Sequence, residues 1–231
     1  MARSRSAFNE YDIVQALNGH TGHELNSNML NLMQSLFGVV DRNEKITASV
    51  IGGDYRKADI LVKYKGNEKN VSIKSGDAKI VHQGFITKIV ELLRSKNVSE
   101  QTIETILLYH YGDDTTDGTG QTRMNYEQVM SFLGDRVQKA NEELNSSRAL
   151  LLEFTDYVLF TGNKTSQKPA DAIYHGDYDY GVCVLKEQYM RYMERKSFGQ
   201  LYNLHIGPFL FRTENGNPRL FNCRDESVIN N

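Results

Sequence analysis

Hydrophobic residues in the first forty positions recur at helical spacing. Ile13 and Leu17 fall on one stripe of the first predicted helix, and Glu10 lies on that same stripe. The carboxylate of Glu10 is therefore expected to point towards the protein interior. A second amphipathic helix is predicted over about residues 24–37, where apolar side chains again recur every three or four positions.

Short strand signals follow the helices and are separated by glycine-containing breaks. They predict an antiparallel meander in residues 46–51, 58–65 and 70–75. Residues 83–96 then carry an apolar helical face. Residues 102–111 are apolar and rich enough in β-branched side chains to predict another strand.

The rest of the chain begins with a polar, glycine-rich loop at 112–120 and then mixes both patterns. Helices are predicted over 126–160, as two helices that meet near 145–147, and over 187–195. Further strands are predicted at 172–174, 181–185, 204–212 and 220–222.

The order of these elements predicts an α/β (α+β) fold in which a mixed central β-sheet is flanked by helices. Three consecutive segments are expected. Residues 1–111 form a core with the hairpin, 112–162 a polar loop with a helical insertion, and 163–231 the strands and helix that complete the fold.

Composition narrows the classes of function. No apolar run reaches the roughly 18 residues that a membrane-spanning helix needs, so we expect a cytoplasmic protein with no membrane partner. The net charge of -2 argues against a protein that coats nucleic acid, but a local basic cleft remains compatible with it. Cys183 and Cys223 lack metal-ligand spacing, and both are expected to be free thiols.

The predicted hairpin brings an acid and a lysine together. If Gly66 and Asn67 form the turn, antiparallel pairing sets Asp59 opposite Lys74, and Ser72 shares their face of the sheet. Hydrolysis of a phosphodiester needs a divalent cation and a cationic group beside the attacking water. Asp59 is suited to bind the cation and Lys74 to hold the water. The alternative is a cross-strand salt bridge on a solvated face.

Glu10 also has two interpretations. A carboxylate on an apolar stripe is costly to bury unless it is paired or bound to a metal, so Glu10 is a candidate second metal ligand. Glutamate is equally favoured by the dipole in the first turn of a helix, where it caps or hydrogen-bonds the backbone.

These residues resemble the PD-(D/E)XK nuclease superfamily, the fold of most type II restriction endonucleases. The resemblance covers mainly residues 5–95, so the fold it implies is restriction-endonuclease-like. The matching positions are Asp59 in KADILVKY, Ser72-Ile73-Lys74 in NVSIKSG, and Glu10 in NEYDIVQALNG.

The chain departs from the family pattern at two positions. Ala58 stands where the family has proline, and Ser72 stands where it has the acid of the triplet. Some lineages with serine there take a glutamate from the following helix, and Glu91 is the candidate here. A solvated glutamate on the helix face is the alternative. The segment SIKSGDAKIVHQG is similar to homologues in which Val-His-Gln opens that helix, which implies that His82 and Gln83 lie near the active site.

The resemblance implies a Mg²⁺-dependent endonuclease, with Mn²⁺ able to substitute, that cuts double-stranded DNA as a site-specific type II restriction enzyme. Asp59 and the Ile73 carbonyl would bind the metal, Glu10 would complete the ligands, and Lys74 would position the water. A homodimer and a cognate DNA methyltransferase are the expected partners. The alternatives are a catalytically degenerate nuclease-fold protein that binds nucleic acid without cutting, and an unrelated α/β interaction domain.

Basic residues crowd around the hairpin, and local charge of this kind can engage phosphates. The alternative is that about half of these lysines only solvate a strand edge. The polar loop at 161–169 is the first choice for contact with a DNA groove. The candidate DNA-binding residues are Lys57, Lys79, His82, Gln83, Lys164, Gln167 and Lys168.

Overall fold

The computed structural model describes residues 5–52, 57–74, 80–162, 168–198, 202–212 and 220–225. By its internal contacts the chain divides into two compact units, each built from two separate stretches of sequence. The first unit comprises residues 1–78 and 159–192, and the second comprises 79–158 and 193–231. This division differs from the three consecutive segments expected from the sequence. Both units contain helices and strands, so the predicted mixed α/β class is confirmed.

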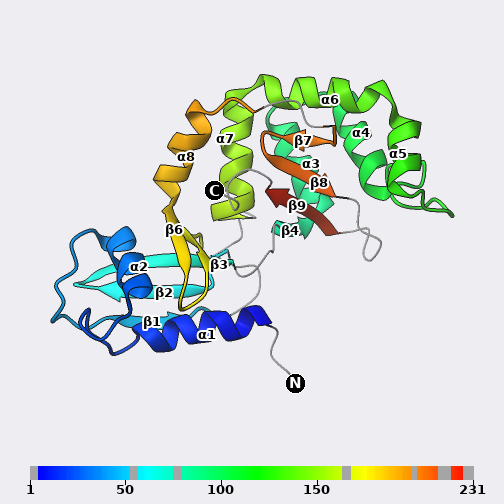
Figure 1. Ribbon diagram of the computed structural model, residues 1–231. Helices are drawn as coiled ribbons and strands as arrows, with labels where there is room; N and C mark the ends of the chain where they lie inside the picture. The colour runs from blue at the N-terminus through cyan, green and yellow to red at the C-terminus, as the bar shows by residue number, and fades with distance from the viewer. Residues whose placement is uncertain are drawn as a thin grey trace. The chain divides into compact units, whose positions relative to one another are not determined.

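The first unit contains a five-stranded sheet flanked by helices α1 (Arg5–Leu17) and α2 (Ser27–Phe37), as Figure 1 shows. The sheet order is β1-β2-β3-β5-β6. Only the β3–β5 pairing is parallel, which makes the sheet mixed as predicted. The strands are β1 (Thr47–Val50), β2 (Ile60–Tyr64), β3 (Asn67–Lys74), β5 (Ala172–Gly176) and β6 (Gly181–Leu185).

The core of this unit lies between the two helices and one face of the sheet. Ile13 and Leu17 are fully buried, so the stripe predicted for the first helix is confirmed. Helix α2 begins after Asn26, whose side chain accepts a hydrogen bond from the backbone N–H of Met29 at 2.7 Å. From the sheet, alternate side chains such as Ile60 complete the core.

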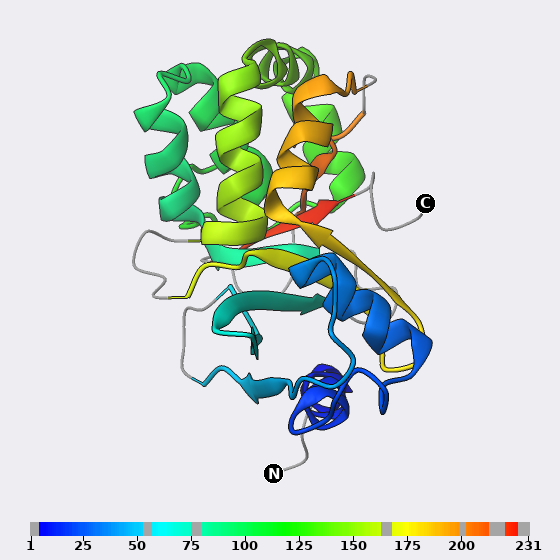
Figure 2. The same cartoon turned by 90° about the vertical axis from the view of Figure 1, so that its left-hand side faces the viewer.

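The second unit contains a four-stranded antiparallel sheet of order β4-β9-β8-β7, with helices beside it (Figures 1 and 2). Phe154 of α7 packs against Phe209 and Phe211 of β8, with ring centroids 5.9 and 5.8 Å apart. The strands are β4 (Ile80–Phe85), β7 (His205–Ile206), β8 (Phe209–Arg212) and β9 (Leu220–Asp225). The helices are α3 (Ile86–Ser95), α4 (Glu100–Tyr111), α5 (Tyr126–Leu133), α6 (Asp135–Ser146) and α7 (Arg148–Asp156).

A π-helical turn, Tyr157–Thr161, follows α7, and helix α8 (Lys186–Arg195) follows β6. A boundary between the two units falls within each of these elements, after Val158 in the turn and after Tyr192 in α8. None of the helices in the described part of the chain is long and apolar enough to cross a membrane.

The prediction of a strand at 102–111 was wrong, because this segment is helix α4. Ser99 caps its start by accepting from the N–H of Thr102, and Gly112 ends it in the left-handed conformation with φ of 62°. The buried side chains of α4 cover more than half of its circumference. Burial on several sides overrode the β-branched composition, which had suggested a strand.

Three other boundaries differ from the sequence predictions. Residues 80–85 form β4, so the helix predicted from residue 83 begins only at Ile86. Residues 126–160 form three helices rather than two, since Gly134, with φ of 49°, separates α5 from α6. The strand predicted at 204–212 is the hairpin β7–β8, which turns at Gly207 with φ of 55°.

Candidate active site

The β2–β3 hairpin turns one residue earlier than predicted. Lys65 and Gly66 both have positive φ, 48° and 78°, as a type I′ turn requires, and the glycine takes the second turn position. The predicted register was therefore wrong by two residues. Asp59 lies beside Ser72 rather than opposite Lys74. A shift of two keeps every side chain on its face, so the three residues still share one face of the sheet.

The carboxylate of Asp59 is oriented by two hydrogen bonds from β3. Its Oδ2 accepts from the hydroxyl of Ser72 at 3.1 Å and from the backbone N–H of Ile73 at 2.7 Å. The backbone of Asp59 is held as well, because its N–H donates to Val71 at 2.9 Å and its carbonyl accepts from Ile51 at 2.8 Å. Both hydrogen bonds are accepted by Oδ2, so they orient the carboxylate of Asp59 and do not involve Oδ1.

Lys74 is the last residue of β3 and is half-buried. No hydrogen bond or ion pair joins its amine to any residue that the structure describes. The alternative interpretation, a salt bridge between Asp59 and Lys74, is therefore not what the described residues show.

The backbone of Ile73 adds a second oxygen near Asp59. The N–H and C=O of a strand residue point to the same side, so the carbonyl of Ile73 faces the edge where its N–H meets Asp59. Pairing with β2 has ended there, at Ile60 and Val71. Carboxylate and carbonyl oxygens are the hard donors that Mg²⁺ and Mn²⁺ prefer, so the donor chemistry at this edge fits such a cation.

Glu10 lies in α1 and is half-buried, on the same stripe as the buried Ile13 and Leu17. Its inward orientation and its assignment as a metal ligand both stay predictions. Within residues 5–225 as described, no group of three or more His, Cys, Asp or Glu side chains is arranged to hold a metal. A cation at this edge would therefore keep several waters, as Mg²⁺ commonly does.

Glu91 lies in α3, in the second unit, and is exposed. Its carboxylate pairs with Lys88 one turn earlier in the helix, at 2.8 Å. This environment agrees with the alternative of a solvated glutamate on the helix face. The role of Glu91 as a replacement metal ligand stays a prediction.

His175 is the residue at this site that sequence reasoning missed. It is the register partner of Lys74 in the parallel β3–β5 pairing, so the two side chains leave the same face of adjacent strands roughly 5 Å apart. Helices α3 to α7 lie between these strands in the sequence, and no local pattern indicates which residues a parallel crossover brings together.

Two of the predicted DNA-binding residues, Lys57 and Lys168, lie together close to Asp59, which immediately precedes β2. The carbonyl of Lys168 accepts from the backbone N–H groups of Lys57 and Ala58 at 3.3 and 3.2 Å. The stem of Lys57 packs over Gly162, where an added Cβ would lie 3.0 Å from its Cγ. Lys168 itself is exposed and available to a polyanion.

The structure does not test the remaining predictions for DNA contacts. Lys79, Lys164 and Gln167 lie outside the described residues. His82 and Gln83 lie on β4, so the expectation that they open a helix was wrong.

The basic patch around the hairpin is partly neutralised. Lys63 pairs with Glu68, and Lys65 pairs with Asp41 at 3.1 Å. These two lysines therefore have acidic partners on the surface of the hairpin, as the alternative of a solvated strand edge implies.

Cys183 on β6 is a free thiol, as expected. Burial raises the pKa of this thiol to about 12, so it does not ionise near neutral pH.

No protein-family model matches the chain, and no curated protein matches it.

Proposed function

We propose that this chain is a Mg²⁺-dependent endonuclease that hydrolyses phosphodiester bonds of double-stranded DNA at specific sites, on a restriction-endonuclease-like fold. The observation that carries the proposal is the arrangement of Asp59 and Lys74. Asp59 is oriented by donors from Ser72 and Ile73, and Lys74 shares its face with no acidic partner among the described residues. A structural salt bridge would have joined the acid and the lysine.

Asp59 and the carbonyl of Ile73 would hold the cation, and Glu10 is the proposed further ligand. Mg²⁺ or Mn²⁺, when bound there, polarises a phosphoryl oxygen and lowers the pKa of a bound water. Ser72 keeps the Asp59 carboxylate in one orientation through its 3.1 Å hydrogen bond. Lys74 donates to the phosphate and positions the attacking water, because its amine lies on the same face of the sheet.

Lys57 and Lys168 are proposed to contact the DNA backbone, since the carbonyl of Lys168 bonds to the backbone of Lys57 and Ala58, next to Asp59. The same proposal extends to a homodimer that matches a palindromic site, to a cognate DNA methyltransferase as partner, and to a cytoplasmic location. Light scattering during size-exclusion chromatography tests the dimer.

A second candidate function is a catalytically degenerate nuclease-fold protein that binds nucleic acid without cutting it. Two observations favour it: Ser72 stands in place of an acid, and the described residues hold no cluster of three metal-binding side chains. Cleavage decides between the two candidates.

The test is digestion of plasmid and of a long DNA of known sequence by the purified chain, with Mg²⁺ or Mn²⁺. Discrete fragments are expected from the wild type. Asp59→Asn keeps the size of the side chain but weakens its metal affinity, and we expect a loss of about 1000-fold or more in rate. Lys74→Ala is expected to lose at least about 100-fold, the size of a proton-transfer or water-positioning contribution.

Matched controls are Asp12→Asn, an exposed acid of α1, and Lys63→Ala, an exposed lysine of the same hairpin paired with Glu68. Both should cut at the wild-type rate. Wild-type protein that binds DNA but leaves it intact with either metal would establish the binding function instead. Cleavage by Asp59→Asn at the wild-type rate would show that Asp59 is not part of the active site.

A further inference from the structure

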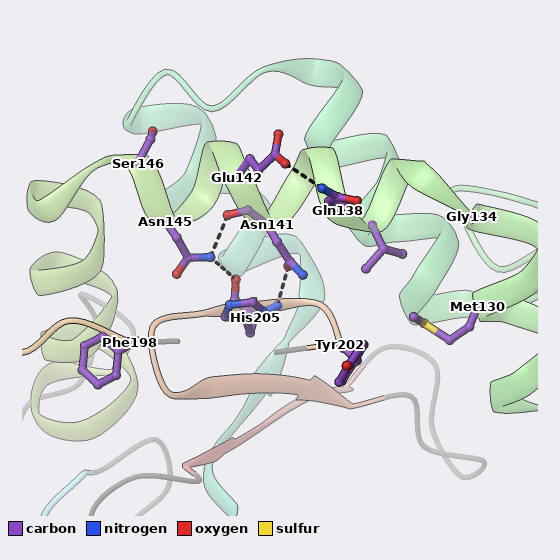
Figure 3. Close-up of a pocket in the computed structure, with 11 residues that line it drawn as sticks. Met130, Gly134, Gln138, Asn141, Glu142, Asn145, Ser146, Phe198, Tyr202 and His205 are labelled. Atoms are coloured by element: carbon purple, nitrogen blue, oxygen red, sulfur yellow. Dashed lines mark hydrogen bonds between the residues drawn. The ribbon is translucent and has the colours of Figure 1, made fainter. Parts of the chain in front are cut away.

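The second unit contains a cavity of about 750 Å³ between α6 and the chain that leads into β7 (Figure 3). This volume is in the range of sites for small organic molecules. Its lining includes Phe198, Tyr202 and His205 from one side and Gln138 and Glu142 from α6. None of these residues belongs to the site around Asp59.

Two asparagines one turn apart on α6 hold the opposite wall in place, as the dashed lines in Figure 3 show in part. Asn141 accepts from the N–H of His205 and donates to the carbonyl of Asn203, both at 3.0 Å. Asn145 donates to the carbonyl of His205 at 3.1 Å and accepts from the N–H of Gly207 at 2.6 Å. The wall is therefore formed before any ligand arrives.

His205 is a buried residue that lines the cavity at this wall. Its side chain is only 4% exposed, and its Nδ1 lies 2.8 Å from the carbonyl of Asn203, which assigns the proton to Nδ1. Nε2 is then an acceptor, and no hydrogen bond to it is made by the described residues. Burial lowers the pKa of His205, so the ring stays neutral. A ligand N–H can donate to this acceptor.

The other lining groups restrict the ligand further. Glu142 can only accept hydrogen bonds, one of them from the amide of Gln138 at 3.0 Å. It carries the only full charge among the described lining residues, which disfavours an anion. Phe198 lines the cavity as well, and Tyr202, which is 95% exposed, offers its ring at the edge. A suitable ligand therefore donates hydrogen bonds, has a flat face and lacks a negative charge.

We propose that this cavity binds a planar heterocycle bearing an amino group, with the chemistry of a nucleobase such as adenine or cytosine. Its N–H groups would donate to Nε2 of His205 and to Glu142, and its face would stack on Tyr202. The free base or nucleoside is the ligand rather than the nucleotide, because a phosphate would meet the charge of Glu142. This inference does not depend on the nuclease proposal.

The test is isothermal titration of the full chain with adenosine and with cytidine. Binding of at least one is expected. Adenosine monophosphate, and the purine nucleoside that lacks the amino group, are each expected to bind at least about tenfold more weakly, since each loses or opposes a hydrogen bond to a charged acceptor. In Glu142→Gln the penalty for the phosphate should disappear, a readout that a change in folding would not mimic.

Tyr202→Ala should weaken nucleoside binding by about tenfold, the size of one stacking contact. Phe132→Ala is the matched control, because Phe132 is an exposed aromatic of α5 that does not line the cavity. Both residues are exposed, so neither variant threatens the fold. Absence of nucleoside binding at millimolar concentration, or equal losses in the two variants, would overturn the proposal. The proposal would also be overturned if arginine amide bound to the cavity and neither nucleoside did.

Discussion

The surroundings of Asp59 matter as much as its carboxylate. A second acid at position 72 would place two negative charges about 3 Å apart, and without a cation one of them would have to take up a proton. Ser72 instead donates a hydrogen bond to Asp59 and is itself 1% exposed. The carboxylate is therefore stable in its orientation before any metal binds.

Ser72→Ala tests this role directly. It removes one of the two side-chain donors, whereas the N–H of Ile73 still holds Asp59. We expect the free energy of unfolding in urea to fall by about 1 kcal/mol. Cleavage should slow by roughly tenfold or less without disappearing, because one such hydrogen bond is worth no more. Ser49→Ala, at an exposed position of β1, is the control. A loss as deep as that of Asp59→Asn would show that Ser72 acts in the chemistry itself.

Among the elements, α6 shows how one helix can hold a distant segment. Its residues Asn141 and Asn145 lie four positions apart, hence on one face, and their amides bond to the backbone of residues 203–207. On the side towards α4, the carboxylate of Glu143 accepts from the N–H and the hydroxyl of Ser99 at the start of that helix. The helix thus connects a turn of the sheet to a helix cap.

Asn141→Ala should therefore destabilise the second unit. It leaves the N–H of His205 and the carbonyl of Asn203 without their partners, and such buried groups cost about 1–3 kcal/mol each. We expect a loss of roughly 2 kcal/mol in unfolding free energy, measured by urea denaturation. Gln138→Ala on the same helix, which bonds only to Glu142, should change stability by less than about 0.5 kcal/mol. Equal losses of unfolding free energy in the two variants would contradict this role of Asn141.

For the molecule as a whole, the decisive feature is that each unit is discontinuous in sequence. The sheet of the first unit takes β1, β2 and β3 from the N-terminal stretch and β5 and β6 from residues 159–192. Without β5, the strand β3 would become an edge strand of the sheet. Its buried apolar residues Val71 and Ile73 would then lose their neighbours on β5 and become more exposed to solvent. The candidate active site sits on this strand, so it depends on a distant part of the chain.

A chain ending at residue 158 should therefore fail to form the first unit. We expect the amides of β3 to exchange rapidly with solvent, by hydrogen exchange and mass spectrometry, and DNA cleavage to be lost. The intact chain is the control and should protect the same amides. Protected β3 amides in the shortened chain would contradict the dependence on β5.

The sequence by itself determined the elements whose pattern is local. The stripes of α1 and α2 predicted their buried faces, and the alternation along the hairpin placed Asp59, Ser72 and Lys74 on one face. That placement survived a register error of two residues, because side chains repeat every second position along a strand. The turn itself was misplaced by one residue, since both Lys65-Gly66 and Gly66-Asn67 contain the glycine that such turns need.

Tertiary structure decided what depends on partners far along the chain. Burial among other helices made residues 102–111 helical despite their β-branched composition. Pairing with β9 made residues 80–85 a strand, and the parallel β3–β5 pairing set His175 beside Lys74. Helix and turn signals reside in neighbouring residues, whereas strand partners are chosen by burial of whole faces. The local geometry of the candidate acid could be read from the sequence, and its neighbours on the sheet could not.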